Sequence, residues 1–151
     1  MVKGASVADG LYLEDLAVGM SAEDVRAVGE ADIVAFADVS GDHNPLHLDE
    51  AYAAKTPFRG RIAHGMLAGA YISALIGGRL PGPGVIYVSQ MLRFKRPIRI
   101  GDEVTVRATI EAIDERQAHV TIAITCLVKG KAAVEGEAVV YAPRRSRAER
   151  T

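Results

Sequence analysis

The sequence predicts an α+β fold in which a curved antiparallel sheet wraps around one buried helix. Two observations support this fold class. Residues 64–78 form an apolar segment without a single charge, which is typical of a buried helix. Residues 104–141 alternate apolar and polar side chains, which is typical of antiparallel strands with one covered face. A helix that is apolar on every side needs cover, and a curled sheet supplies most of it.

The length and composition bound the kind of protein. A chain of 151 residues with 49% hydrophobic content is large enough for a real core. We expect one domain over residues 1–151, with its core at about residues 14–141 and a charged tail at residues 142–151. The single cysteine, Cys126, excludes an internal disulfide and a multi-cysteine metal site, and its place in an alternating segment predicts inert packing.

The charge and hydropathy patterns also exclude several partners. Eighteen basic and 19 acidic residues give a net charge of -1, which argues against nucleic-acid or anionic-membrane binding. The sequence has no cationic leader followed by an apolar run, and no apolar stretch reaches ~18 residues. We therefore expect a cytoplasmic protein that does not insert into membranes.

The N-terminal part predicts a turn, a strand and two helices. A short turn over residues 13–20 leads into a first strand over residues 21–28. Apolar residues at helical spacing predict a helix that starts at Glu30, in an acidic first turn, and stops at Ser40-Gly41. A shorter helix follows Asp49, its predicted N-cap.

The C-terminal part predicts the central helix and the remaining strands. A polar, basic connector over residues 58–63 precedes the apolar helix, which ends at Gly77-Gly78. Strands are then predicted over four segments: 85–95, 104–112, 120–126 and 134–141. The arginine-rich tail is expected to be a solvated fray.

The polar segment over residues 39–48, V-S-G-D-H-N-P-L-H-L, is the candidate active site. Gly41 and Asn44-Pro45 are turn signals, so we expect a loop. Asp42 and His47 lie five residues apart across this kink, close enough to form an acid/base pair. The N–H of Gly65, at the start of the apolar helix, is a candidate oxyanion donor, which suits chemistry that gives a thioester carbonyl enolate character.

Other interpretations of these residues were weighed. Asp and His often cap helices, so spacing alone does not establish catalysis. A metal site would use Asp42, His43, His47 and His64, but the intervening proline removes the helical i,i+4 geometry, so no metal and no cofactor are predicted. The sequence also contains no nucleophile elbow and no phosphate-binding nucleotide loop.

Three segments resemble a known family in the same order along the chain. Residues 36–49 (F-A-D-V-S-G-D-H-N-P-L-H-L-D), 64–67 (H-G-M-L) and 87–104 resemble the MaoC-like, (R)-specific enoyl-CoA hydratases, the hydratase 2 group. The resemblance covers about residues 14–141. It implies a hot-dog fold, with a long central helix wrapped by an antiparallel sheet, and a homodimer whose sheets run on from one subunit to the next.

The resemblance implies a role for each matching residue. Asp42 would take a proton from a water molecule, and His47 would hold that water and supply a proton to the alpha carbon of a trans-2-enoyl thioester. The product would be the (3R)-hydroxyacyl thioester, and the reverse reaction a dehydration. Gly65 would polarise the carbonyl, and Asn44 and His64 would support the dyad.

The remaining matches concern the substrate, an acyl-CoA thioester or the thioester of an acyl carrier protein. Met66 would flank the cavity, and Ser73 and Ile76, on one helix face, would line its acyl end, with core packing as the alternative. Five basic residues are candidates for phosphate contacts, or else ordinary solvated side chains: Arg59, Arg61, Arg93, Lys95 and Arg96. His43 occupies a variable position of the motif.

Three other functions remain open from the sequence. A (3R)-hydroxyacyl-carrier-protein dehydratase of fatty-acid synthesis would use the same residues. A non-catalytic acyl-thioester-binding subunit of a heterodimeric dehydratase would not need the intact dyad of Asp42 and His47. A thioesterase is the third alternative, although the G-D-x-N-P-x-H arrangement favours the hydratase.

Overall fold

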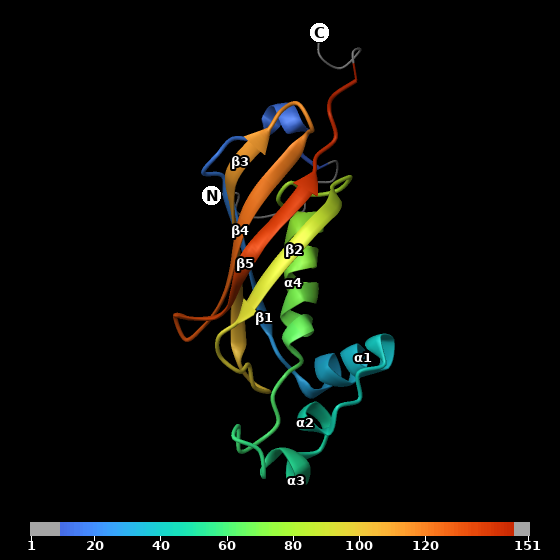
Figure 1. Cartoon of the computed structure of the whole chain (residues 1–151), viewed down its shortest axis with the longest axis vertical. Helices are drawn as coiled ribbons and strands as arrows, with labels where there is room; N and C mark the ends of the chain where they lie inside the picture. The colour runs from blue at the N-terminus through green and yellow to red at the C-terminus, as the bar shows by residue number, and fades with distance from the viewer. Residues whose placement is uncertain (1–9, 147–151) are drawn as a thin grey trace.

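A five-stranded antiparallel sheet packs against one long helix in the computed structural model, which describes residues 10–146 (Figure 1). The strand order is β1-β3-β4-β5-β2, so β1 and β2 lie at the two ends of the sheet. The strands are β1 (Ser21–Ala27), β2 (Ile86–Phe94), β3 (Glu103–Asp114), β4 (His119–Val128) and β5 (Lys131–Tyr141).

Three helices lie apart from the sheet, beyond the N-terminal end of the long helix (Figure 1). These are α1 (Glu30–Ser40), α2 (Pro45–Leu48) and α3 (Glu50–Ala53); the long helix is α4 (Gly65–Gly78), and a 3-10 helix, η1 (Leu13–Asp15), precedes β1. Asp49 caps α3 as predicted, because its Oδ1 accepts a hydrogen bond from the N–H of Tyr52 at 3.0 Å.

The alternation in the C-terminal half produces the core. The inward-facing residues of β3 and β4 are at most 1% exposed: Val104, Val106, Ala108, Ile110, Val120, Ile122, Ile124 and Cys126. They pack with the buried residues of α4, among them Ile72 and Leu75. Cys126 is therefore a packing residue, as predicted, and burial raises the pKa of its thiol to about 11.

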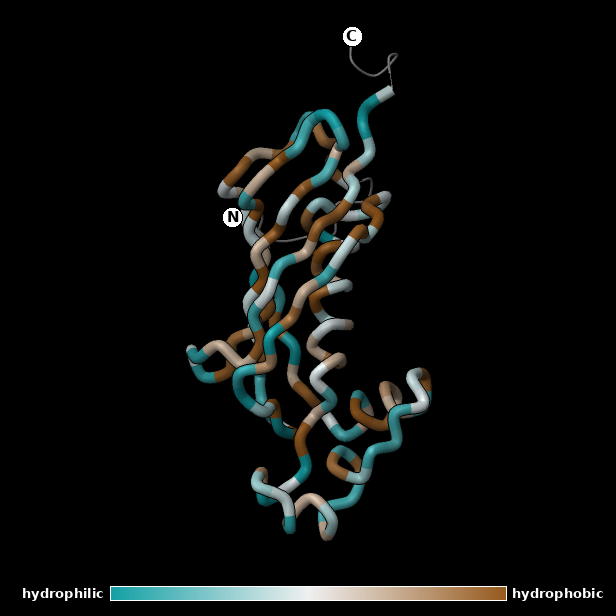
Figure 2. The backbone as a smooth tube through the Cα atoms, viewed as in Figure 1, coloured by the Kyte–Doolittle hydropathy of each residue, from teal (hydrophilic) through white to brown (hydrophobic). Residues whose placement is uncertain are grey.

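The prediction that α4 is buried on every side is wrong for the single chain. The sheet covers only one side of the helix, and the opposite side is open in Figure 1. On that side Met66 is 57% exposed, and Ala70, Ser73 and Ala74 are exposed as well. In Figure 2 this helix is drawn in white and brown along its length, so its open side is not hydrophilic.

Close approach of two strands explains one glycine of the sheet. Gly136 of β5 pairs with Leu92 of β2, and a Cβ at position 136 would overlap the carbonyl oxygen of Met91. Only glycine allows β2 to lie this close, and β2 is the strand that borders the open side of α4.

Several boundaries differ from the sequence predictions. The last strand begins at Lys131, three residues before the predicted start at 134. Ile62 and Ala63 are buried, so the connector over residues 58–63 is not polar throughout. Within the described residues, no helix has both the length and the hydrophobicity needed to cross a lipid bilayer.

The described part of the arginine-rich C-terminal tail also differs from the prediction of a solvated fray. Arg145 forms an ion pair with Asp15 at 2.6 Å and lies over the ring of Tyr12, while Arg144 donates to the carbonyl of Glu115. These two arginines are therefore docked on the domain and not frayed. The rest of the predicted fray, residues 147–151, lies outside the described residues.

Candidate active site

Asp42 follows directly from the end of α1. Gly41 ends that helix with φ +76, a left-handed conformation that favours glycine, and its N–H bonds to the carbonyl of Ala37 at 2.9 Å. One carboxylate oxygen of Asp42 accepts a hydrogen bond from the N–H of Asn44 at 3.2 Å. The residue is exposed, so its second oxygen is available to a substrate or a water molecule.

His47 stands on a single helical turn, α2, where the sequence had predicted a loop. Asn44 is the N-cap of this turn, with Oδ1 accepting from the N–H of Leu46 at 3.1 Å, and Pro45 occupies its first position. This turn rotates His47 inward, so that it is only 8% exposed. The signal for the turn was present in the Asn-Pro pair, which is an N-cap followed by a favoured first helical residue.

The tautomer of His47 follows from its one ring contact. Nδ1 of His47 lies 2.8 Å from the carbonyl oxygen of Ile62. A carbonyl oxygen only accepts hydrogen bonds, so Nδ1 carries the hydrogen. The other ring nitrogen, Nε2, is therefore the one left for substrate chemistry.

His64 touches both members of the dyad. Its Nε2 donates to the backbone carbonyl of Asp42 at 3.0 Å, and its ring lies 4.0 Å from that of His47 and 4.8 Å from that of Phe36. His64 is 2% exposed, and among the described residues its Nδ1 has no hydrogen-bond partner. Since Nε2 donates its hydrogen to the carbonyl of Asp42, Nδ1 is the ring nitrogen left over for another contact.

The three side chains come together as one cluster. Asp42, His47 and His64 each offer an atom within 4.8 Å of the others. One carboxylate and two imidazoles also form a donor set for a transition metal. One nitrogen of each ring donates to a carbonyl, which leaves the other nitrogen and the carboxylate of Asp42 for an acid/base pair or for a metal ion alike.

His43 does not belong to this cluster. Its Nδ1 lies 3.2 Å from the carbonyl oxygen of Gly41, and its Nε2 lies 3.6 Å from a carboxylate oxygen of Asp38 on α1. Its side chain is 59% exposed. The four-residue metal set considered from the sequence is therefore not assembled, because His43 points to α1 and solvent.

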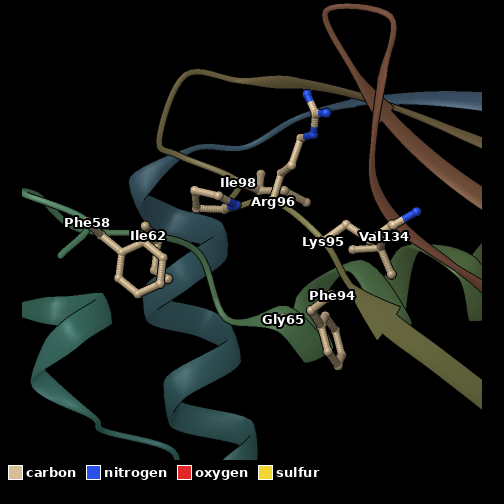
Figure 3. A pocket seen from close by; sticks show the side chains of 9 residues that line it. Phe58, Ile62, Gly65, Phe94, Lys95, Arg96, Ile98 and Val134 are labelled. Carbon is tan, nitrogen blue, oxygen red and sulfur yellow. The ribbon is translucent and has the colours of Figure 1, made fainter.

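Gly65 borders a cavity that Asp42, His47 and His64 do not line, although Ile62 and Gly65, on either side of His64 in the sequence, do. The cavity has a volume of about 310 Å³ and is bordered by Gly65, Phe58, Ile62, Phe94, Arg96 and Ile98, among others (Figure 3). The N–H of Gly65 belongs to the first turn of α4, where N–H groups have no partner within the helix. The ring of Phe94 lies so close that a Cβ at position 65 would stand 2.7 Å from its Cε1.

The predicted acyl-pocket residues do not share one face of α4. Met66 and Ser73 border a second hollow of about 350 Å³ on the open side of the helix, together with Tyr87 and Gln90. Burial raises the pKa of Tyr87 to about 12, so the phenol stays protonated and donates to Gln90 at 3.0 Å. Ile76 is 0% exposed and packs in the core, as in the alternative considered from the sequence.

The five basic candidates for phosphate contacts have different surroundings. Lys95 pairs with Glu135 at 2.8 Å, and Arg93 lies on the outer face of the sheet beside Glu111 and other acidic residues. Arg59 and Arg96 are exposed, and among the described residues the guanidinium of Arg96 makes no hydrogen bond or ion pair. Arg96 also borders the cavity at Gly65, which makes it the best placed of the five.

Arg61, the fifth, lies beneath His47. Its Nε donates to the carbonyl of His47 at 2.6 Å, and its two Nη atoms donate to the carboxylate of Glu30 at 2.8 and 3.0 Å. The Arg61 side chain is 13% exposed. Its partners lie 14 and 31 residues away along the chain, so no local pattern in the sequence could have identified this contact.

Known proteins share both this sequence and this geometry. The family model for the MaoC like domain matches residues 16–132. The chain is 50% identical over 134 residues to the (R)-specific enoyl-CoA hydratase of Rhodospirillum rubrum. This match covers 89% of this chain and 93% of the relative. The chain belongs to the MaoC-like family. The predicted family is thereby confirmed.

Two further relatives of this MaoC-like protein agree. It is 43% identical over 139 residues to the 3-hydroxybutyryl-CoA dehydratase of Methylorubrum extorquens, covering 92% of this chain and 88% of the relative. The solved structure of the R-hydratase PhaJ1 from Pseudomonas aeruginosa, in its unliganded form, matches with a TM-score of 0.85 and 46% identity. That match covers 90% of this chain and 88% of the other, and it confirms the hot-dog fold.

Proposed function

We propose that this MaoC-like protein is an (R)-specific enoyl-CoA hydratase, which adds water to a trans-2-enoyl-CoA and gives the (3R)-hydroxyacyl-CoA. In the reverse direction it is a dehydratase. The observation that carries the proposal is the pairing of Asp42 and His47 within 4.8 Å, next to the free first turn of α4. The names of the two curated relatives support the same chemistry.

The proposed reaction uses one water molecule held between the two side chains. Asp42 takes a proton from the water while its oxygen bonds to the beta carbon, and the electron pair of the double bond moves toward the alpha carbon. His47 gives the proton on Nε2 to the alpha carbon. Because Nδ1 of His47 already carries a hydrogen, this step starts from the doubly protonated ring, whose Nδ1–H stays bonded to the carbonyl of Ile62.

The dyad itself restores the starting protonation states of its two side chains. After addition Asp42 is protonated and His47 is neutral, and the proton returns from the carboxyl group to the imidazole before the next cycle. The N–H of Gly65 faces the thioester oxygen in this scheme and stabilises the negative charge that collects there. The acid/base pair performs each step without a metal or a cofactor, so a chelator is expected to leave the rate unchanged.

The direct test is turnover of crotonyl-CoA, followed as loss of enoyl-thioester absorbance. Asp42→Asn and His47→Gln should each lower kcat by at least about 100-fold with little change in Tm. His43→Gln is the matched control, because His43 lies outside the cluster, and it should keep wild-type turnover. A wild-type protein that is inactive on every chain length would refute the proposed function.

The alternative functions differ in the carrier of the acyl group, in the reaction product or in the need for a dyad. A panel of enoyl-CoAs of graded length beside one enoyl carrier protein compares the hydratase with the carrier-protein dehydratase, since both would use the same dyad. A thioesterase would instead release free thiol from the substrate. The non-catalytic subunit is the least favoured alternative, because such a subunit needs neither Asp42 nor His47.

We also propose that the protein is a homodimer formed along β2 and the open side of α4. β2 ends the sheet among the described strands, and it exposes large apolar side chains, including Ile86 (60%), Val88 (51%) and Met91 (47%). Met66 continues this apolar surface onto the helix. Light scattering should give about twice the chain mass of 16.1 kDa, and a monomeric mass would refute the dimer.

A further inference from the structure

Three of the four consecutive residues 61–64 hydrogen-bond to the two dyad residues; we call residues 61–64 the strap. Arg61 donates to the backbone carbonyl of His47, and the carbonyl of Ile62 accepts from the ring of the same histidine. His64 donates to the backbone carbonyl of Asp42. The strap therefore contacts both dyad residues, and it continues directly into the first turn of α4.

Arg61 differs from the other members of the strap because its side chain reaches two elements at once. Its Nε bonds to α2 and its two Nη atoms bond to Glu30, the first residue of α1. The same helix ends at Gly41, next to Asp42. Arg61 thus joins the turn that carries His47 to the start of the rigid helix that delivers Asp42.

We propose that Arg61, held by Glu30, is a positioning residue that fixes His47 relative to Asp42. Arg61 holds the backbone of His47 while the neighbouring Ile62 holds its ring, so Nε2 is kept at the place of the reacting water. The inference rests on the proposed function, because it assigns Arg61 to the orientation of that dyad and not to the substrate.

The geometry favours positioning over a general gain in stability. The Glu30 side chain is 56% exposed, and an ion pair with an exposed partner contributes little to stability. The Arg61 side chain is 13% exposed and uses three nitrogen atoms with directional partners, which suits orientation. A lysine at this position would keep the positive charge but could not form the planar fork. Charge and orientation can therefore be separated by substitution.

The experiment compares Arg61→Met, Arg61→Lys and Glu30→Gln in the full-length protein. We expect Arg61→Met to lower kcat on crotonyl-CoA by about 10- to 100-fold while KM changes by less than about threefold. Arg61→Lys should recover only part of the loss, and Glu30→Gln should lower kcat less than Arg61→Met. Adding Glu30→Gln to Arg61→Met should cause no further loss, since the glutamate acts through the arginine.

Arg107→Met is the matched control. Arg107 forms a shorter ion pair, 2.6 Å from Nε to Glu23 against 2.8 Å for Arg61 and Glu30, between β3 and β1, away from the dyad. Its removal should leave kcat unchanged. A folded Arg61→Met protein with kcat within about twofold of wild type would overturn the inference, as would a change confined to KM or an equal loss in Arg107→Met.

Nitrogen NMR of the histidine rings provides a readout that does not depend on activity. The chain has only four histidines, so their ring signals can be assigned by substitution. The Nδ1–H of His47, bonded to the carbonyl of Ile62, should give one set of ring-nitrogen signals in the wild type and a heterogeneous set in Arg61→Met; an unchanged set of signals would count against the inference. If Arg61→Met does not fold, Glu30→Gln with unchanged kcat would overturn it. An inactive wild-type enzyme would refute the proposed function alone.

Discussion

Replacing Gly65 with alanine tests whether the start of α4 belongs to the reaction site. The new Cβ would stand 2.7 Å from Cε1 and 2.9 Å from Cδ1 of Phe94, whereas ordinary contact begins at 3.4 Å. The ring therefore has to move by roughly 0.7 Å. Phe94 is 54% exposed, so it can rotate, and we expect the free energy of unfolding to fall by only about 1 kcal/mol.

The effect on turnover should be much larger than the effect on stability. The Cβ and the displaced ring both enter the cavity at Gly65, and a shift of this size at a reacting centre can cost about 100-fold in rate. The assay is steady-state hydration of crotonyl-CoA together with urea unfolding of the same sample. Adding Phe94→Leu should recover part of the rate. A Gly65→Ala protein with wild-type kcat would refute the place of this N–H in the site.

Three further predictions concern other parts of the molecule. Asn44→Ala removes the cap of α2, so urea unfolding should show a loss of about 1 kcal/mol together with reduced turnover, whereas Asp49→Ala should cost similar stability with turnover retained; equal activity in both would contradict this. The raised pKa of Cys126 should keep the thiol unreactive toward Ellman's reagent at about pH 8 until the protein is unfolded, and stability should decline as the pH rises above 9.0, where only the unfolded thiol ionises. Gly136→Ala forces a Cβ onto the carbonyl of Met91 and should cost at least about 2 kcal/mol, which a Tm equal to wild type would disprove.

The parts of the fold that were predicted correctly depend on short-range patterns. Strict alternation gave β3 and β4, because burial of one face of a strand appears at every second residue. The absence of charged residues predicted α4. An acidic first turn at one end and Gly41 at the other predicted α1. Asp42 and His47 lie within one short segment that resembles the family motif, and the structure brings them within 4.8 Å of each other, while their catalytic role stays a prediction.

The parts that were missed depend on contacts between distant segments. The open side of α4 could not be distinguished from its buried side, since both are apolar in sequence. The role of Arg61 depends on Glu30, 31 residues away, and on the backbone of His47. The contact of His64 with the carbonyl of Asp42 involves a backbone atom, which side-chain patterns do not report.

The residues of the acid/base cluster and those of β2 lie far apart in the sequence, so mutation can change one set without the other. The dyad, the strap and the first turn of α4 all lie within residues 42–68, whereas Tyr87, Val88 and Gln90 of β2 border the hollow on the open side of the helix. The acid/base cluster and the β2 side of this hollow thus lie in separate stretches of the chain. A mutant library confined to Tyr87, Val88 and Gln90 leaves Phe94 at the Gly65 cavity unchanged, so it is expected to shift the preferred acyl length while the rate on the newly preferred substrate stays near that of the parent.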